Sequence, residues 1–371
     1  MSTRKYITTF MASTLVVFAV VTSFNYYIDP FTYYHPPWTA INLSKNQRYA
    51  NPGLARNYDY GLAVVGTSHV MEISSSRLSQ ITGVRSINLP FTAGLIREMA
   101  ELVRLIVKEE KASTVMLEMN FPSFSLGDVV SDYPDEFPMY LYQPRMEMPL
   151  RYLMSFDTLR TSMAALDEPG QVTLDNKDDI GERQYGRDRV VSVWNYLVRT
   201  WDRKRLEFWA RHQHEIKMPA EIMEARLVPL FEAYPEVDFE LFLPPNSILF
   251  FLHHASLSAN DFDRWLSFRN MLGGLAERFE HVRIHDLQTD FQTMTNLDNY
   301  RDLGHYNPQI LQRLFETIVA GEALVDAETV SRNSIELRKT VVKFGQGFCR
   351  QQDVECSENL RAWLSSQDPA R

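Results

Sequence analysis

The chain has 371 residues, of which 45% are hydrophobic and 23% charged, and its formal net charge is −9. This composition supports a sizeable hydrophobic core, built as one large domain or as a domain with an insertion. The acidic balance and the lack of a long basic run argue against nucleic acid as a partner.

An uncharged apolar run from Tyr6 to Ile28 follows Arg4 and Lys5. A run of this length can cross the hydrocarbon core of a bilayer, about 30 Å thick, as one helix. Basic residues on the short N-terminal flank favour a cytoplasmic N-terminus. A cleaved signal peptide is the alternative, although no Ala-x-Ala-like site follows the run. We expect residues 1–28 to be a single-pass anchor in the cytoplasmic membrane, with the remainder periplasmic or extracellular.

Residues 29–58 are rich in Pro, Asn and Tyr. Asp29-Pro30 and Asn51-Pro52 resist a continuous helix or strand. We expect this segment to be an extended connector between the anchor and an α/β domain over residues 59–330.

Strands and helices are expected to alternate after the connector. The apolar run 61–66 predicts a buried strand, and Gly66 at its end would let the chain turn sharply. Further strands are predicted at 84–88 and 114–119, and apolar residues recur at helical spacing over 95–109. The alternation implies right-handed crossovers and a parallel sheet.

The alternation breaks over residues 121–235, which we expect to form a largely helical insertion above the carboxyl edge of the sheet. Helices are predicted at 188–217 and from Pro219 to 233, among many aromatic residues. Most of these aromatic side chains are expected to pack in a core, although an exposed patch could bind sugar rings or lipid.

The sheet is expected to resume with strands at 239–243 and 281–287, separated by a helix at about 259–278. Asn307-Pro308 then predicts the start of another helix, with Asn307 as the N-cap and Pro308 at the first position.

The last segment, residues 331–371, is interpreted as a C-terminal tail. It holds the only two cysteines, Cys349 and Cys356. In an oxidising compartment they could form a disulfide that ties down the tail, and two free thiols are the alternative.

Three residues could form a hydrolytic site. Ser68 follows the first predicted strand, and the carboxyl ends of parallel strands are where ligands bind and active sites form. Asp302 and His305 precede the last predicted helix of the sheet domain. Serine becomes a nucleophile when a base takes its proton and an acid orients that base. The Gly-x-Ser-x-Gly elbow of α/β-hydrolases is absent, because residue 70 is Val.

A tetrahedral intermediate also requires hydrogen-bond donors for its oxyanion. The side-chain amide of Asn120 follows the third predicted strand and could be one donor. The backbone N–H groups of Ser68 and of Gly94, in the loop after the second strand, could be the others.

This order of residues resembles the SGNH (GDSL-like) hydrolase superfamily over about residues 59–120 and 238–320. The resemblance implies a flavodoxin-like, three-layer α/β/α fold with a parallel sheet. It also implies the following site: catalytic Ser68, Asp302 and His305, and oxyanion donors Gly94 and Asn120.

The anchor, the block Gly66-Thr67-Ser68 and the large insertion resemble the membrane-anchored, envelope-facing members, which include relatives of proteins that O-acetylate exopolysaccharides or modify teichoic acids. The resemblance implies an esterase or O-acyltransferase that acts on an acylated envelope polysaccharide or a related ester, together with a membrane acyl-transfer partner. Two departures are Thr67 in place of the family's Asp and the absence of the Gly-x-Asn-Asp context around Asn120. These departures leave open the alternative of a non-catalytic envelope protein that keeps the fold for binding or assembly.

Other polar residues are weaker candidates. His69 adjoins Ser68, but neighbours in sequence generally point in different directions. Glu118 could face the site or form a salt bridge. Several histidine pairs lack the glutamate motif of a zinc helix, so neither a metal nor a cofactor is expected; they are His212/His214, His253/His254 and His281/His285.

Overall fold

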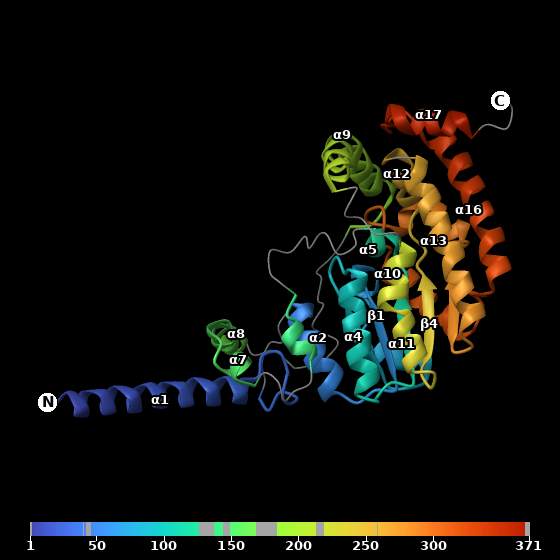
Figure 1. The fold of residues 1–371 in the computed structure, drawn as a ribbon. Helices are drawn as coiled ribbons and strands as arrows, with labels where there is room; N and C mark the ends of the chain where they lie inside the picture. Colours follow the sequence, from blue (N-terminus) through green and yellow to red (C-terminus); the bar gives the residue numbers. More distant parts are fainter. Residues whose placement is uncertain are drawn as a thin grey trace.

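The computed structural model describes residues 2–39, 41, 46–125, 137–143, 149–167, 184–212, 219–257 and 259–367. The helix α1 (Thr3–Ile28) extends away from an α/β domain, with its N-terminal end far from the sheet (Figure 1). Within the described residues, α1 alone is both long and apolar enough to cross a membrane.

A six-stranded sheet forms the centre of the domain, in the order β2-β1-β3-β4-β5-β6. The strands are β1 (Leu62–Gly66), β2 (Ser86–Pro90), β3 (Thr114–Glu118), β4 (Asp238–Leu243), β5 (Val282–Asp286) and β6 (Leu324–Val325). The first five run parallel, in the register Val64↔Asn88 and Val64↔Met116 around β1. β6 is antiparallel to β5, so the expectation of a wholly parallel sheet is wrong at this edge. An edge strand has a single neighbour, and a short antiparallel strand is often added there.

The predicted helices of the sheet domain are confirmed. They are α4 (Ile96–Lys108), α13 (Ala259–Arg278) and α15 (Pro308–Val319). Two further helices, which were not predicted, are α3 (Ser75–Thr82) and α12 (Ile248–Leu257). The side chain of Asn307 accepts a hydrogen bond from the N–H of Ile310, as expected of an N-cap. α4 packs against β1, α3 against β2 and α13 against β5, so that the strands are buried between helices.

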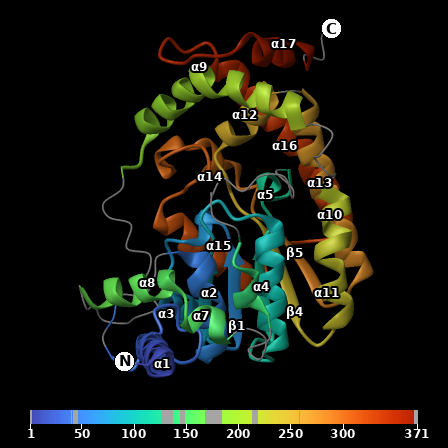
Figure 2. The ribbon, with the colours of Figure 1, turned by 60° about the vertical axis from the view of Figure 1, so that its left-hand side comes forward.

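The insertion is helical in its described parts. It contains α5 (Phe121–Ser125), α6 (Met139–Tyr142), α7 (Pro149–Leu153), α8 (Phe156–Asp167), α9 (Arg187–His212), α10 (Pro219–Arg226) and α11 (Val228–Ala233). The single helix predicted over 219–233 is divided in two, because Pro229 in the first turn of α11 has no N–H to continue the helix of α10. Figure 2 shows α9 across the top of the domain, and α7 and α8 beside α1.

The prediction of a fully extended connector is wrong, because residues Gln47–Asn57 form the helix α2 with Pro52 inside it. A proline leaves the carbonyl four residues earlier without its helical donor. Here that carbonyl belongs to Arg48, and it accepts a hydrogen bond from the hydroxyl of Tyr142 at 2.8 Å. A tertiary contact therefore offsets the break that the sequence pattern predicted.

The C-terminal segment is folded rather than a loose tail. It forms α16 (Ala327–Phe348), which packs along α13, and α17 (Glu358–Ser366), which packs on α12. Cys349 and Cys356 form a disulfide, with their Cα atoms 5.7 Å apart, between the two helices. The predicted pairing is thus confirmed, and the bond fixes the turn that brings α17 back over the domain.

Candidate active site

Ser68 lies at the carboxyl edge of the sheet. It begins the short 3₁₀ helix η1 (Ser68–Val70) directly after Thr67, which follows β1. β1 lies between β2 and β3, so loops from both neighbouring strands flank the serine. The hydroxyl of Thr67 accepts a hydrogen bond from the N–H of His69 and fixes the start of this turn.

The structure brings Ser68, His305 and Asp302 together. The Oγ of Ser68 lies 2.7 Å from Nε2 of His305. On the other side of the ring, Nδ1 of His305 lies 2.8 and 2.9 Å from the two carboxylate oxygens of Asp302. This is the order of contacts that a serine nucleophile, its general base and an orienting acid require.

The loop that carries Asp302 and His305 is held by its own backbone. A β-bridge joins Tyr300 to Tyr306 across it. The Oδ1 of Asp302 accepts hydrogen bonds from the N–H groups of Gly304 and His305 at 2.9 and 2.8 Å. Asp302 and His305 are therefore placed by a closed turn just before α15, rather than by long flexible connections.

Asp302 is held as a carboxylate. Burial acts to raise its pKa, but the hydrogen bonds and charge of His305 and the two backbone N–H groups outweigh burial and lower the pKa below its ordinary value of 3.8. The side chains of His305 and Asp302 remain 25% and 31% exposed, so a substrate can reach the pair from solvent.

The predicted oxyanion residues lie on either side of Ser68. Gly94 follows β2, and Asn120 follows β3 by two residues. Among the described residues, the Oδ1 of Asn120 is buried and has no hydrogen-bond partner. Ala93, next to Gly94, has a φ of 46°, a strained conformation that clusters at functional sites when it occurs in non-glycine residues.

α2 positions the loop that contains Gly94. The guanidinium of Arg48 donates to the carboxylate of Glu98 at 2.7 and 2.8 Å and to the carbonyl of Thr92 at 3.2 Å. The side-chain amide of Asn51 donates to the carbonyl of Pro90 at 2.8 Å. The helix that the sequence pattern did not predict therefore holds one side of the candidate oxyanion site.

A second histidine–carboxylate pair, His69 and Glu118, lies beside the first. Nδ1 of His69 is 2.7 Å from Oε1 of Glu118, and Oε2 of Glu118 accepts the N–H of Thr67 at 2.6 Å. Both side chains are almost fully buried. Glu118 is thus paired with His69, which makes a salt bridge when that histidine is protonated, and Thr67 belongs to the same network.

The expected role of Gly66 requires a correction. Its φ is not in the left-handed region, so the residue does not supply a sharp turn of that kind. A Cβ at this position would lie 2.8 Å from Oε2 of Glu118 and 2.9 Å from Val70. Gly66 is needed because the carboxylate of Glu118 approaches the backbone closely.

A third group, which sequence reasoning missed, borders Asp302. Arg301 donates to the carboxylate of Glu72 at 2.9 Å, and its Nε lies 3.6 Å from Asp302. Tyr185, from the insertion, donates to the same Glu72 carboxylate at 2.7 Å. The insertion therefore reaches the rim of the site, through residues whose sequence spacing gave no signal.

The remaining histidines form separate contacts. His254 pairs with Asp261 at 2.5 Å, and His285 with Glu240 at 2.7 Å. His281 contacts the carbonyl of Phe231 at 2.9 Å. Across the described ranges, no group of three or more His, Cys, Asp or Glu residues could hold a metal ion. His214 lies outside those ranges, as does the side chain of His212.

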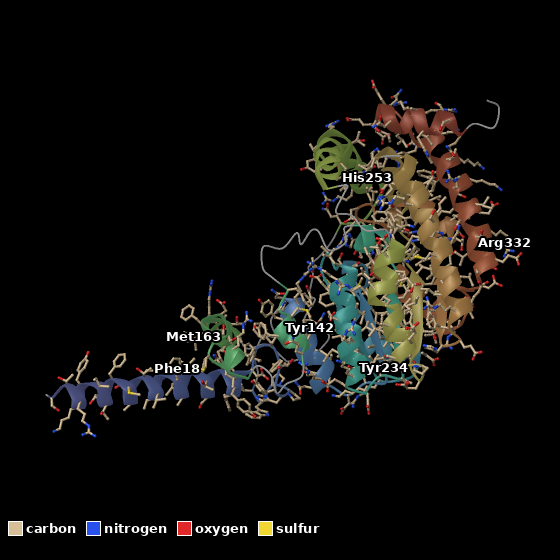
Figure 3. All side chains as sticks on the ribbon, in the orientation of Figure 1. Phe18, Tyr142, Met163, Tyr234, His253 and Arg332 are labelled. Carbon is tan, nitrogen blue, oxygen red and sulfur yellow. A yellow bond between two sulfur atoms is a disulfide. The ribbon has the colours of Figure 1, made fainter. Side chains whose placement is uncertain are left out.

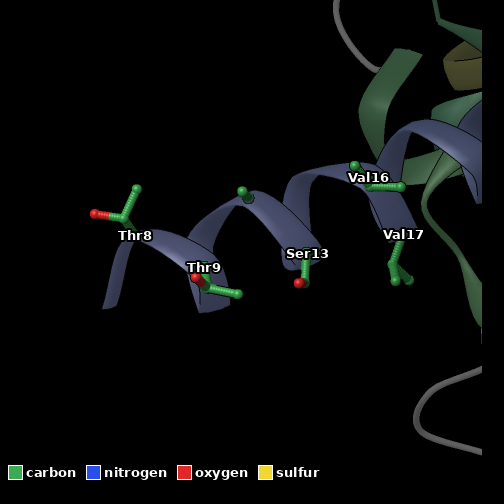
Figure 4. A pocket seen from close by; sticks show the side chains of 6 residues that line it. Thr8, Thr9, Ser13, Val16 and Val17 are labelled. Carbon is green, nitrogen blue, oxygen red and sulfur yellow. The ribbon is translucent and has the colours of Figure 1, made fainter. Parts of the chain in front are cut away.

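A hollow far from this chemistry runs along α1 between Thr8 and Val17 (Figure 4). It is lined by residues of this one helix, so it is an open helix side and not an enclosed binding site.

The site thus contains a serine with a partly exposed histidine–aspartate pair, flanked by two loops that hold candidate oxyanion donors. Comparisons with protein-family models, curated proteins and solved structures find no match for this chain.

Proposed function

We propose that this chain is a membrane-anchored esterase or O-acyltransferase of the SGNH type that acts on an acylated cell-envelope polysaccharide or a related ester. One observation carries the proposal: the 2.7 Å contact between Ser68 and His305, with Asp302 on the far side of the imidazole ring. The strand order β2-β1-β3-β4-β5 is that of flavodoxin-like sheets, which place ligands at this same edge.

In the proposed reaction, Oγ of Ser68 attacks the ester carbonyl carbon while Nε2 of His305 takes the hydroxyl proton. The carbonyl double bond opens to an oxyanion. When it reforms, the ester C–O bond breaks and the alcohol leaves with the proton from His305. Water or a sugar hydroxyl then attacks the acyl carbon while His305 takes its proton. The bond between that carbon and Oγ of Ser68 breaks, Oγ takes the proton from His305, and the product is the free acid or the acylated sugar.

The oxyanion donors proposed are the N–H groups of Ser68 and Gly94 and the side-chain amide of Asn120. These residues follow the three adjacent strands β1, β2 and β3 at the same edge of the sheet, so the proposed donors lie in neighbouring loops. The donor of Asn120 would be its Nδ2, whereas the buried atom without a partner among the described residues is the acceptor Oδ1. The proposed role therefore rests on the place of Asn120 after β3, beside the strand that leads to Ser68.

The location proposed is the cytoplasmic membrane, with the α/β domain in the periplasm or outside the cell. The 26-residue apolar helix α1 supports the anchor. Arg4 and Lys5 at its N-terminus support the orientation. The disulfide between Cys349 and Cys356 supports an oxidising compartment. A membrane protein that supplies the acyl group is a proposed partner of the transfer reaction.

A fluorophosphonate probe tests the nucleophile on the detergent-solubilised full chain. The oxygen of an activated serine displaces fluoride and retains the label. We expect labelling of the wild type, none of Ser68→Ala, and unchanged labelling of Ser365→Ala, which removes an exposed hydroxyl on α17.

A folded wild-type chain that takes no label would contradict the proposed nucleophile. If Ser68→Ala and His305→Ala also left the cellular function of the protein intact, the non-catalytic envelope protein would be the better hypothesis.

A further inference from the structure

The helix α8 buries its small residues and exposes its large apolar ones. Thr158, Ser162 and Ala165 are 2%, 0% and 3% exposed, whereas Phe156 and Met163 are 77% and 58% exposed. A surface helix of a water-soluble domain has the opposite distribution, with its apolar stripe toward the core.

The side chains of α8 divide into three stripes at helical spacing. One stripe is buried, and its members are Thr158, Ser162 and Ala165. The second is apolar and wholly or partly exposed, and its members are Phe156, Leu159, Met163 and Leu166. The third is polar and includes Asp157, Arg160 and Asp167. The exposed apolar residues therefore lie on one side of α8, separate from its buried side and from its polar side.

The buried stripe packs against the last turns of α1. Ser162 donates a hydrogen bond to the side chain of Asn25 at 3.0 Å, and Asn25 donates to the carbonyl of Leu153 at 2.8 Å. Ala165 packs with Ile28 and Phe24 of α1. Small residues and interhelical hydrogen bonds of this kind are typical of helix contacts within membranes.

The joint between α1 and α7 is also fixed. Asp29 ends α1 in the left-handed conformation and accepts the N–H groups of Tyr33, Tyr34 and His35. The hydroxyl of Tyr152, in α7, donates to the same carboxylate at 2.6 Å. The position of the α7–α8 unit relative to α1 is therefore set by buried hydrogen bonds.

α8 crosses α1 at a steep angle. Figure 1 shows α1 lengthwise and α8 nearly end-on, whereas Figure 2 shows α8 lengthwise and α1 nearly end-on. A helix that crosses a membrane-spanning helix in this way lies along the membrane surface. Figure 3 labels Met163 on α8 and Phe18 on α1, and both side chains are exposed.

Exposed aromatic residues lie at the C-terminal end of α1 and in the segment that follows it, near the turns on which α8 packs. Tyr26, Tyr27 and Trp38 are all exposed, and the ring of Trp38 contacts both tyrosine rings. Tyr and Trp are enriched at membrane–water interfaces. The exposed stripe of α8 therefore belongs to a helix that packs on the last turns of α1, where the outer interface is expected.

We propose that α8 is a second membrane contact, with Phe156, Met163 and Leu166 inserted among the acyl chains of the outer leaflet beside α1. This inference rests on the membrane anchoring in the proposed function. Lipid is favoured over a second copy of the chain because the stripe adjoins the candidate membrane span. Two crossed helices in one bilayer would fix the tilt of the α/β domain and the height of Ser68 above the membrane.

Site-specific quenching tests the contact. Both native cysteines are in the disulfide, so one introduced cysteine in the full chain can carry a bimane label specifically. The chain is reconstituted in vesicles of phosphatidylethanolamine and phosphatidylglycerol, with or without bromine on the acyl chains. The variants are Met163→Cys in the apolar stripe, Arg160→Cys in the polar stripe, Phe18→Cys in α1 and Ile335→Cys on the distant helix α16.

We expect brominated lipid to lower the fluorescence at 163 by about twofold or more, since interfacial helices insert to the acyl-chain boundary. Labels at 160 and at the exposed position 335 are expected to keep their fluorescence. Quenching at 18 without quenching at 163 would overturn this inference alone. A blue-shifted but unquenched label at 163 would also overturn it and indicate a second copy of the chain. No quenching at 18 would refute the anchor, and this inference with it.

Discussion

Two histidine–carboxylate pairs lie side by side at the carboxyl edge of the sheet, and they have different surroundings. The rings of His69 and His305 have centroids 5.1 Å apart. The pair of His305 and Asp302 is partly exposed and reaches the hydroxyl of Ser68. The pair of His69 and Glu118 is buried, and Nε2 of its histidine faces the backbone at Gly304.

The difference shows that a histidine next to a carboxylate does not by itself make a catalytic base. A catalytic base must be accessible to substrate, and its free ring nitrogen must contact the nucleophile. Of the two pairs, only His305–Asp302, the outer pair, has both features; His69–Glu118 is the inner pair. The inner carboxylate instead accepts the N–H of Thr67 and fixes the turn that presents Ser68. We interpret the inner pair as a positioning element for the outer one.

The largest expected effect is the difference in kcat between variants of the two histidines. His305→Gln removes the proposed base and is expected to lower kcat for an activated acetyl ester by about 10⁴-fold. His69→Gln keeps the base and disturbs only its surroundings, so its loss should stay below about 10²-fold. Stopped-flow or plate-reader hydrolysis assays on both variants measure the ratio, and equal losses would contradict the assignment.

The next effect concerns stability. Glu118→Ala leaves the N–H of Thr67 and the ring of His69 buried without their acceptor. Removal of one partner of a buried pair is expected to lower the free energy of unfolding by about 3 kcal/mol or more. Glu316→Ala removes an exposed partner of Arg77 and should cost less than about 1 kcal/mol. Urea denaturation of both variants gives the comparison, and similar costs would show that the inner pair is not a fixed part of the fold.

The packing between the His69–Glu118 and His305–Asp302 pairs can be tested with a methyl group at Gly304. In Gly304→Ala, the Cβ would lie 2.8 Å from Nε2 of His69, so overpacking is expected to cost about 1–3 kcal/mol. Gly274→Ala is the matched control, because its Cβ meets no atom within 4 Å in the helix α13. The control should be neutral or stabilising by up to about 1 kcal/mol. Thermal unfolding of both variants measures the difference, and a neutral Gly304→Ala would mean that the two pairs are loosely packed.

The smallest effect is a pH dependence of stability. The folded state lowers the pKa of Asp302 below 3.8, so the carboxylate stabilises the fold above that pH. This contribution is lost as the pH falls through the lowered pKa. The stability advantage of the wild type over Asp302→Asn should therefore shrink from pH 5 toward pH 2. A pH-independent difference in urea midpoints would contradict the observed hydrogen bonds of Asp302.

Local patterns were sufficient for much of the fold. Apolar runs located β1, β3 and β5, and the helical spacing of α4 and the Asn-Pro cap of α15 gave those helices correctly. These features depend on residues within a few positions of one another, so a single sequence contains them. The roles of Ser68, Asp302 and His305 remain predictions, although the distances between them support those roles.

Long-range contacts account for what was missed. α2 persists through Pro52 because Tyr142, which is distant in sequence, supplies the missing donor. α16 and α17 looked like a tail because their apolar residues become buried only against α13 and α12. The direction of β6 depends on its place at the sheet edge.

Local sequence patterns predict an apolar N-terminal helix, an alternation of strands and helices, a possible disulfide and three residue types suited to acyl chemistry. The contact between His305 and Ser68 depends on the assembled fold, because residues 68 and 305 come together only when the sheet forms. The contact of Glu118 with the turn at Thr67 and the outward orientation of the apolar side of α8 also depend on packing between distant segments. Contacts between distant segments depend on packing in three dimensions, and the spacing of residues along one chain does not encode them directly.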